Sequence, residues 1–339
     1  MKLGRQAFLN HIGFTLAPIE VTNEVLVEKY QNEFTTSILK KSGVDKRYKL
    51  PSGTLISDFA TEAADNFFQK YDINKLEIDF LIFCSECPDY LGPATSCIIQ
   101  KKCNLPKNIG TLDISFGCSG YTYGLAMAKA LIESGLAEKV LFITADMPNA
   151  VIPANNLNLN SLFSDASSVS LISCERIGLG FQVNDFCFGT DGTGAESIIS
   201  RNSAFAKSDD KLLDEEEYMK SFVRGRMEMN GEDVFRFSLR EVPVLVKEIL
   251  SKHHLSFEEI DLFVFHQASE IILKALKRKL NIADEKFFSN LKNFGNTVSS
   301  SIPIALLDAI KQGLVNPGMR IMLLGFGIGY SWSGTIIEN

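Results

Sequence analysis

The order strand, loop, helix, strand is predicted twice along the chain, and this internal repeat constrains the fold more than any other feature. Residues 78–84 read IDFLIFC, and residues 260–266, which lie 182 positions later, read IDLFVFH. Both are short apolar runs rich in β-branched and aromatic residues, and both follow a charged stretch of helical character. Each run is therefore predicted to be a buried strand.

A second pair of segments follows at nearly the same spacing. Cys118, between small residues, opens a segment that ends at Gly135, and Asn296 opens one that ends at Gly313; both pairs are 178 positions apart. Each segment has apolar residues at helical spacing and a glycine at the helix end, and a strand is expected after it, at 140–143 and at 321–324. Two similar βαβ units could arise by chance, but the matching offsets favour a gene-duplicated α/β protein with halves at 1–174 and 175–339.

The duplication by itself suggests where a site lies. In open α/β sheets, ligands bind where strand ends and helix starts gather at the carboxyl edge. If the halves are related by a pseudo-twofold axis, Cys118 and Asn296 occupy equivalent helix starts, and Cys84 and His266 lie at equivalent strand ends.

Size and composition narrow the class of protein. The 339 residues suit two domains or one fused double unit. A formal net charge of −7 without a basic block argues against non-specific nucleic-acid binding, although an acidic carrier protein could dock on a local basic patch. No run reaches the roughly 18 apolar residues of a membrane span, and the N-terminus lacks the features of a signal peptide. The seven scattered cysteines suit a reducing compartment, so we expect a cytoplasmic protein.

Cys118 is a candidate nucleophile. Free amide N–H groups and the helix macrodipole favour a thiolate at a helix start, where the pKa of a cysteine can fall to roughly 3.5–7.5. Gly117 and Gly120 would let a substrate approach the backbone closely. The alternative is a small buried hydrophobic residue, because free cysteine is commonly buried.

His266 and Asn296 are the candidate partners of Cys118. The imidazole of His266 abruptly closes an apolar strand and needs a hydrogen-bond partner, which a purely structural histidine would need as well. Asn296 could equally be an ordinary helix N-cap. Its duplication-related position opposite Cys118 favours a role in the site.

Three other features point away from cofactors and metals. The stretch GFGIGY at 325–330 follows a strand, but no helix of useful length follows it, so a backbone turn facing the site is favoured over a dinucleotide loop. Cys84 and Cys87 form a C-x-x-C pair without a second pair, which argues against structural zinc. The charged segment 207–232 is expected to be a solvated helix or lid. We expect no cofactor and no metal.

Together, these stretches resemble the β-ketoacyl-acyl-carrier-protein synthase III family of thiolase-fold condensing enzymes. The resemblance rests on DISFGCSGYTYGLAMA around Cys118, FVFHQAS around His266 and NFGNTVSSSIPIAL around Asn296. MNGEDVFRF at 229–237, FGTDGTGAES after Cys187 and the closing GFGIGYSWSG support it, and the matches run from about residue 43 to the C-terminus. The resemblance implies a thiolase-like duplicated five-layer αβαβα fold.

The family implies a ping-pong mechanism. Cys118 would attack an acyl thioester, on coenzyme A or on a carrier protein, and hold the acyl group covalently. The backbone N–H groups of Cys118 and Ile328 would form the oxyanion hole. His266 and Asn296 would donate hydrogen bonds to the thioester oxygen of malonyl-acyl-carrier protein as CO₂ departs. The expected partners are therefore an acyl carrier protein and a second copy of the chain in a homodimer, with neither a nucleic acid nor a membrane.

The sequence also departs from the family pattern. Ser37 and Lys41 stand where the family has a tryptophan and an arginine that bind coenzyme A. Ile271 replaces an arginine associated with carrier docking, and Ile328 interrupts a glycine triplet. These differences suggest a non-standard acyl donor.

Three alternative activities stay open at this point. One is acyl transfer to an alcohol or amine without decarboxylation, and another is a non-catalytic acyl-carrier-binding subunit. A 3-hydroxy-3-methylglutaryl-type synthase would need an additional acidic group. Glu86 lies near a strand end, but its position alone does not assign it that role.

Overall fold

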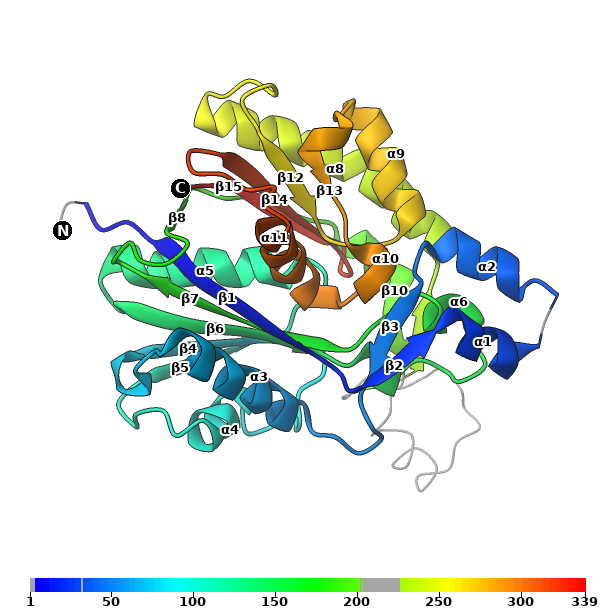
Figure 1. Ribbon diagram of the computed structural model, residues 1–339, viewed down its shortest axis with the longest axis horizontal. Coiled ribbons are helices and arrows are strands. Elements are labelled where there is room, and N and C mark those ends of the chain that lie inside the picture. The colour runs from blue at the N-terminus through cyan, green and yellow to red at the C-terminus, as the bar shows by residue number, and fades with distance from the viewer. Residues whose placement is uncertain (1–3, 32, 202, 204–225) are drawn as a thin grey trace.

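The computed structural model describes residues 4–31, 33–201, 203 and 226–339 (Figure 1). Its strands are β1 (Phe8–Leu16), β2 (Ile19–Thr22), β3 (Lys46–Lys49), β4 (Phe80–Cys84), β5 (Gly110–Ile114), β6 (Lys139–Asp146), β7 (Ala166–Ser173), β8 (Phe181–Val183), β9 (Cys187–Thr190), β10 (Ile198–Arg201), β11 (Arg226–Met229), β12 (Leu262–Phe265), β13 (Phe287–Phe288), β14 (Arg320–Gly327) and β15 (Ser331–Glu338). Its α-helices are α1 (Asn23–Tyr30), α2 (Thr35–Ser42), α3 (Ile56–Tyr71), α4 (Thr95–Lys102), α5 (Gly120–Ser134), α6 (Leu157–Asn160), α8 (Gly231–His253), α9 (Glu270–Leu280), α10 (Leu291–Phe294) and α11 (Ser301–Lys311).

The strand order of the main sheet repeats. The sheet runs β13-β12-β14-β15-β8-β1-β7-β6-β4-β5, with β9 also paired to β15. Read inward from each edge, β5-β4-β6-β7-β1 matches β13-β12-β14-β15-β8 in order. The directions match as well: the first two pairings of each set are parallel and the next two are antiparallel. The two sets meet where β1 pairs with β8.

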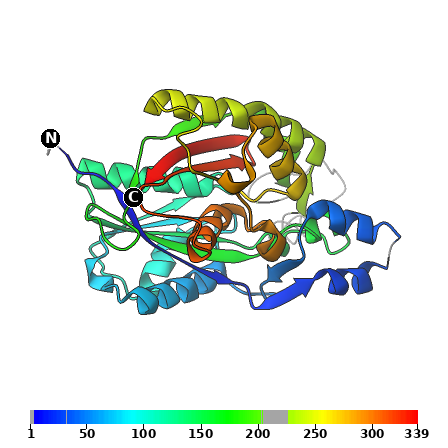
Figure 2. The same cartoon turned by 45° about the horizontal axis from the view of Figure 1, so that its top comes forward.

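The elements stack in five layers (Figures 1 and 2). Helices α3 and α4 cover the outer face of the strands around β6, and α8 covers the outer face of β14 and β15, with α9 packed beside it. Helices α5 and α11 lie in the middle, and each contacts strands of both sets. Being covered on both sides, they are apolar around much of their circumference, as a buried helix must be. The expected five-layer αβαβα architecture is confirmed.

The predicted elements appear with small shifts. The runs at 78–84 and 260–266 form β4 and β12, and the two following apolar runs fall within β6 and β14. Helix α5 ends as expected, with Gly135 at a φ of 78° after its last residue. The second helix differs from expectation. It begins only at Ser301, because a 3₁₀ turn at Val298–Ser300 comes first.

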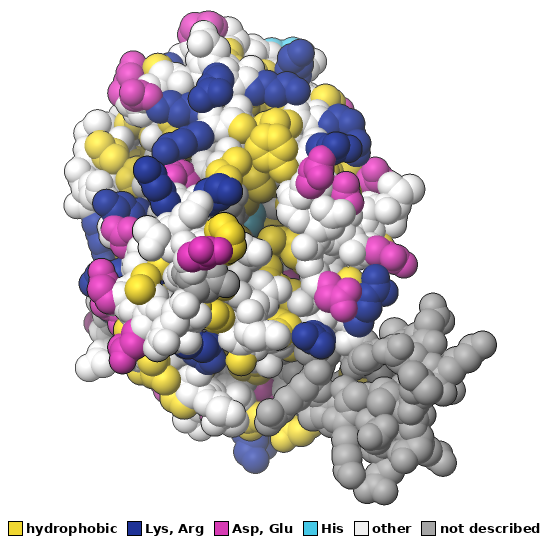
Figure 3. Space-filling view, turned by 90° about the vertical axis from the view of Figure 1, so that its right-hand side faces the viewer, with side chains coloured by type: hydrophobic (Ala, Val, Ile, Leu, Met, Phe, Trp, Pro, Cys, Tyr) yellow, Lys and Arg dark blue, Asp and Glu magenta, His cyan; other side chains and the backbone are white. Residues whose placement is uncertain are grey.

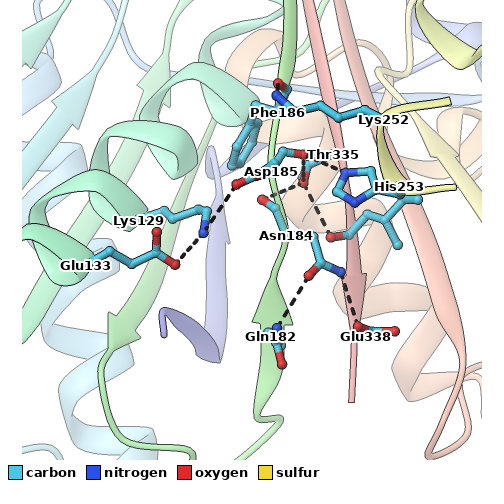
Figure 4. A network of polar contacts seen from close by, with 11 residues as sticks. Lys129, Glu133, Gln182, Asn184, Asp185, Phe186, Lys252, His253, Thr335 and Glu338 are labelled. Carbon is cyan, nitrogen blue, oxygen red and sulfur yellow. Dashed lines mark hydrogen bonds and ion pairs between the residues drawn. The ribbon is translucent and has the colours of Figure 1, made fainter. Parts of the chain in front are cut away.

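A polar network holds the connection between β8 and β9, two strands that both pair with β15 (Figure 4). Lys129 on α5 lies 3.7 Å from Asp185 (Nζ to Oδ1), and the Nε2 atom of His253 on α8 lies 3.0 Å from the Asp185 carbonyl. The hydroxyl of Thr335 on β15 donates to the carbonyls of Asn184 and Asp185, at 3.0 Å in each case. The network therefore joins the middle helix layer, the C-terminal strand and an outer helix.

Most of the segment expected to be a solvated helix or lid, 207–232, lies outside the described residues. Its described part is different from that expectation, since Arg226–Met229 forms β11 against β10 and α8 begins at Gly231. Searching the described ranges, we find no helix with the length and apolar character needed to cross a membrane.

Candidate active site

Cys118 lies on a tight turn directly before α5. The Gly120 N–H donates to the Gly117 carbonyl (2.7 Å), which closes the turn around Cys118 and Ser119. The Ser119 hydroxyl is 2.7 Å from the Ser331 hydroxyl, and Ser331 Oγ donates to the carbonyl of Ile328 (2.8 Å). The nucleophile turn is thus tied to the turn that connects β14 and β15.

The end of β14 packs directly on the Cys118 side chain. A Cβ atom on Gly327 would lie 2.5 Å from Cys118 Cβ and 2.7 Å from its Sγ, so only glycine fits there without displacement. The backbones of Ile328 and of Cys118 itself lie close enough to the Cys118 sulfur to lower the pKa of its thiol. These are the two groups expected to form the oxyanion hole, and they lie at the same sulfur.

The ionisation of Cys118 differs from expectation. Burial raises the pKa of the Cys118 thiol, and the Glu86 carboxyl raises it further, while the two backbone N–H groups lower it less. The helix begins only at Gly120, and the side chain is buried. Loss of hydration therefore outweighs the helix-start effect, so the pKa of Cys118 is raised where the sequence led us to expect a lowered one, which favours the thiol over the thiolate.

His266 directly follows β12 and is buried. Its backbone N–H donates to the Leu324 carbonyl (2.7 Å), and its Nδ1 lies 2.7 Å from the hydroxyl of Ser301. The ring packs edge-on against Phe326, with the ring centroids 5.7 Å apart. Burial lowers the pKa of His266 to about 3, so the imidazole is neutral near pH 7 and can donate one hydrogen bond without carrying charge.

Asn296 is buried and held through its backbone as well as its side chain. Its N–H donates to the Leu162 carbonyl, and its own carbonyl accepts from the Ser164 N–H, both at 2.9 Å. The side-chain Nδ2 donates to the carbonyl of Ala268 (3.1 Å), and Oδ1 accepts from the Val298 N–H (2.9 Å). An amide nitrogen has two hydrogens, so one donor remains for a ligand. Asn296 is not the N-cap of α11, whose N-cap is Ser300.

Val298 connects the histidine and the asparagine. Its backbone lies beside the His266 ring, and its N–H donates to Asn296 Oδ1 (2.9 Å). Its φ of 51° lies in the left-handed region, which costs an L-residue roughly 1–2 kcal/mol. A β-branched residue rarely adopts this conformation, and such strain concentrates at functional sites.

Two carboxyl groups flank the nucleophile turn. Asp146, the last residue of β6, is buried and accepts hydrogen bonds from the Glu86 N–H (2.9 Å), the Ser299 N–H (3.1 Å) and the Ser299 hydroxyl. Glu86 follows β4, and its carboxyl lies against Gly117. Burial raises the pKa of Asp146 to about 7 and, with the neighbouring Asp146 charge, that of Glu86 to about 8.

The structure connects Cys118, His266 and Asn296 through short contacts. Gly327 touches Cys118, its neighbour Phe326 touches His266, and Ala268 links His266 to Asn296 through hydrogen bonds. The sequence reasoning missed Ser301 and Asp146. A carboxylate that closes the apolar run of β6 was the available signal for Asp146, just as the imidazole closing β12 was for His266.

Three of the four residues that depart from the family pattern lie on the surface. Ser37 and Lys41 are exposed on α2, and Ile271 is 49% exposed on α9. Helices α2 and α9 are in contact, and Gly43 at the end of α2 packs on Glu270. These three departures therefore cluster on one face, whereas the fourth, Ile328, lies at Cys118.

Comparisons with known proteins agree on one family. The family model described as 3-oxoacyl-[acyl-carrier-protein (ACP)] synthase III matches residues 112–192, which include Cys118. The model of the C-terminal part of the same family matches residues 250–339, which include His266, Asn296 and Ile328.

Relatives and solved structures match nearly the whole chain. The β-ketoacyl-[acyl-carrier-protein] synthase III of Clostridium tetani is 31% identical over 331 residues, 96% of each chain. A crystal structure of a 3-oxoacyl-(acyl-carrier-protein) synthase III superposes with a TM-score of 0.90 at 36% identity, covering 98% of this chain and 100% of the other. The Thermus thermophilus synthase III gives a TM-score of 0.85 at 28% identity and 98% coverage of both chains. The expected thiolase-like fold is thereby confirmed.

Proposed function

Because the chain belongs to the β-ketoacyl-[acyl-carrier-protein] synthase III family of condensing acyltransferases, we propose that it joins an acyl group to malonyl-acyl-carrier protein by decarboxylative Claisen condensation. The product is a 3-oxoacyl thioester. The observation that carries the proposal is a buried thiol, Cys118, facing the backbone of Ile328 beside two uncharged donors, His266 and Asn296.

In the first half-reaction, Cys118 Sγ adds to the acyl carbonyl, and the carrier thiol leaves. The negative charge that develops on the carbonyl oxygen is stabilised by the N–H groups of Cys118 and Ile328. A lost donor of this kind typically costs roughly 2.7–4 kcal/mol of transition-state stabilisation. The bare Cα of Gly327 lets the backbone at the end of β14 approach the sulfur closely.

In the second half-reaction, His266 and Asn296 donate to the thioester oxygen of the malonyl group. The electrons of the breaking C–CO₂ bond pass to an enolate, whose carbon attacks the acyl-Cys118 carbonyl and displaces the thiolate. Two neutral donors suit this step, because they stabilise the enolate without repelling it. The low pKa of His266 supports this role, since the ring stays neutral at any pH at which the protein would work.

We also propose that the chain divides into two thiolase-like halves, 1–174 with the nucleophile and 175–339 with the histidine and asparagine. The repeated strand order supports this division. So does the placement of α5 and α11 in the middle layer, where each contacts strands of both sets.

The acyl donor is proposed to arrive on a carrier protein rather than on coenzyme A. A surface cavity of about 660 Å³ lies beside α2 and the start of α9, and its charged lining consists of four carboxylates and two lysines, which are Glu24, Glu28, Asp45, Glu270, Lys40 and Lys292. A net negative wall disfavours the phosphates of coenzyme A.

The surroundings of this cavity suit an acidic carrier. Lysine and arginine side chains gather around a hollow on this side of the molecule (Figure 3). Exposed Lys41 on α2 and exposed Lys274, Arg278 and Lys279 on α9 form a basic face near the end of β12. Such a face attracts an acidic carrier protein and speeds its association.

A homodimer is proposed through β5. This strand ends the main sheet and pairs with β4 alone within the described part of the chain, and Leu112 on it is 41% exposed. An open, partly apolar sheet edge readily pairs with a second strand. Light scattering should give twice the chain mass, and Leu112→Lys should lower the measured mass toward that of the monomer. The cytoplasmic location expected from the sequence also remains a proposal.

The test of the function follows the acyl group by intact mass. Wild type, Cys118→Ala and a control, Cys97→Ala, which changes an exposed cysteine on α4, are incubated with acyl-CoA and acyl-carrier thioesters. We expect an adduct on wild type and on Cys97→Ala only, formed faster from the carrier thioester and cleared by malonyl carrier protein. Clearance by an alcohol or amine instead would favour simple acyl transfer. No adduct from any donor would overturn the proposal.

A further inference from the structure

The two half-reactions assign no role to Glu86, although its carboxyl lies beside the turn that holds Cys118. A Cβ atom on Gly117 would lie 2.4 Å from the carboxyl carbon of Glu86 and 2.5 Å from each of its oxygens. The Glu86 carboxyl therefore packs on the bare Cα of the residue that precedes the nucleophile. Among charged side chains, it is the one that most strongly influences the Cys118 thiol.

The Glu86 carboxyl has no fixed partner. Across the described ranges, no hydrogen bond or ion pair reaches either of its oxygens; only its backbone N–H is bonded, to Asp146 (2.9 Å). The side chain is only partly buried, but a carboxyl that loses part of its hydration usually accepts hydrogen bonds in return. Asp146 has them, since it accepts from Glu86 and twice from Ser299.

The two carboxyls thus differ in role. Three donors favour the charged form of Asp146, whereas the unpartnered Glu86 keeps its proton longer, and burial together with the Asp146 charge raises the pKa of Glu86 to about 8. The other titratable groups that face Glu86 are the thiols of Cys84, Cys87 and Cys118; burial raises the pKa of all three, so they remain protonated. Asp165 is one step further away and acts on Asp146.

We propose that Glu86 exchanges a proton with Cys118 during acyl transfer and is a fourth catalytic residue of this site. The proposal rests on the condensing function and adds the group that activates its nucleophile. A thiol held un-ionised by burial needs a base when it attacks, and a base titrating near the working pH is the most effective.

The proton balance closes over both half-reactions. In the first, the Cys118 thiol forms its bond to the acyl carbon and gives its proton to the Glu86 carboxylate. As the bond to the carrier sulfur breaks, the carrier thiolate takes that proton from Glu86. In the second, Cys118 leaves as a thiolate when the carbon–carbon bond forms, and Glu86 passes it a proton drawn from solvent.

The test compares Glu86→Gln, which keeps the size and polarity but cannot titrate, with wild type and with Glu77→Gln. Glu77 lies before the opposite end of β4 in a surface ion pair with Lys139, so it is a matched control. Single-turnover acylation is measured by intact mass between about pH 6 and about pH 9, and alkylation of Cys118 by iodoacetamide is measured in parallel. General base catalysis typically contributes 10²–10⁴-fold, so we expect acylation of Glu86→Gln to fall by roughly 10²-fold with an unchanged KM.

The pH profile and the alkylation separate catalysis from structure. Wild-type and Glu77→Gln acylation should rise as Glu86 ionises, and Glu86→Gln should lose that rise. Alkylation of Cys118 in Glu86→Gln should lose the rise that follows Glu86 ionisation as well, because the same base takes the thiol proton in both attacks. A wild-type rate of acylation by Glu86→Gln, or a lower rate that keeps the wild-type rise with pH, would overturn the proposal. The absence of any wild-type adduct would instead overturn the condensing function itself, and this inference with it.

Discussion

The imidazole of His266 lies 2.7 Å from the hydroxyl of Ser301 (Nδ1 to Oγ), and Ser301 is the first residue of α11. The segment 296–301 therefore supplies Asn296, places the Val298 backbone beside the His266 ring and orients the imidazole through Ser301. The two proposed donors to the malonyl thioester are set by one stretch of chain. Their geometry should consequently be sensitive to changes in this stretch that touch no substrate.

Ser301→Ala removes the Nδ1 partner of His266. Since a neutral hydrogen bond contributes about 0.5–1.5 kcal/mol net, we expect decarboxylative condensation to slow by up to roughly tenfold. Acylation of Cys118 should be unchanged, and Ser301→Thr should retain most of the rate. The measurement is the single-turnover decay of acyl-Cys118 on addition of malonyl carrier protein. Equal slowing of both half-reactions would assign Ser301 a structural role instead.

His266→Ala and Asn296→Ala should separate the half-reactions. Each removes a donor used only in the second one, so the acyl adduct should form normally and then persist, with clearance slowed by roughly 10²–10³-fold. His253→Ala is the matched control, because His253 contacts the Asp185 carbonyl far from the site (Figure 4). Loss of adduct formation in either site variant would contradict the assignment.

The reactivity of Cys118 should depend on pH as that of a buried thiol does. The raised pKa means that the thiolate fraction is small at pH 7 and grows as pH rises, so alkylation by iodoacetamide should still be accelerating at pH 9. Peptide mapping by mass spectrometry gives the rate at Cys118, with the exposed Cys97 as an internal reference. A plateau below pH 8 would indicate a thiolate in the free enzyme.

Gly327→Ala should impair the reactivity of Cys118 more than it disturbs the rest of the fold. The added methyl would lie 2.5 Å from Cys118 Cβ, so the sulfur must move or the core must expand, at a typical cost of 1–3 kcal/mol, roughly. We expect slow acylation and a lowered melting temperature. Gly192→Ala adds the same methyl where no atom lies within 4 Å and should change neither quantity.

Local sequence signals located the three proposed catalytic residues for a simple reason. A polar residue that closes an apolar strand, as His266 does, or small residues that open a helix, as around Cys118, can be recognised without knowing the rest of the fold. The periodicity of the repeat also predicted the central strands and helices, because each buries its apolar face whatever its neighbours are. The catalytic roles themselves remain predictions.

The duplicated βαβ pattern, the buried strands and the positions of Cys118, His266 and Asn296 could be predicted from the chain alone, because they follow from local patterning. Three contacts became evident only in the folded molecule: Ser301 faces His266, Asp146 holds Ser299 and Glu86 lies over Gly117. The tertiary structure also reversed the expected ionisation of Cys118. These properties depend on contacts between residues far apart in sequence and on the water that those contacts exclude, and neither is encoded in any local window of the chain.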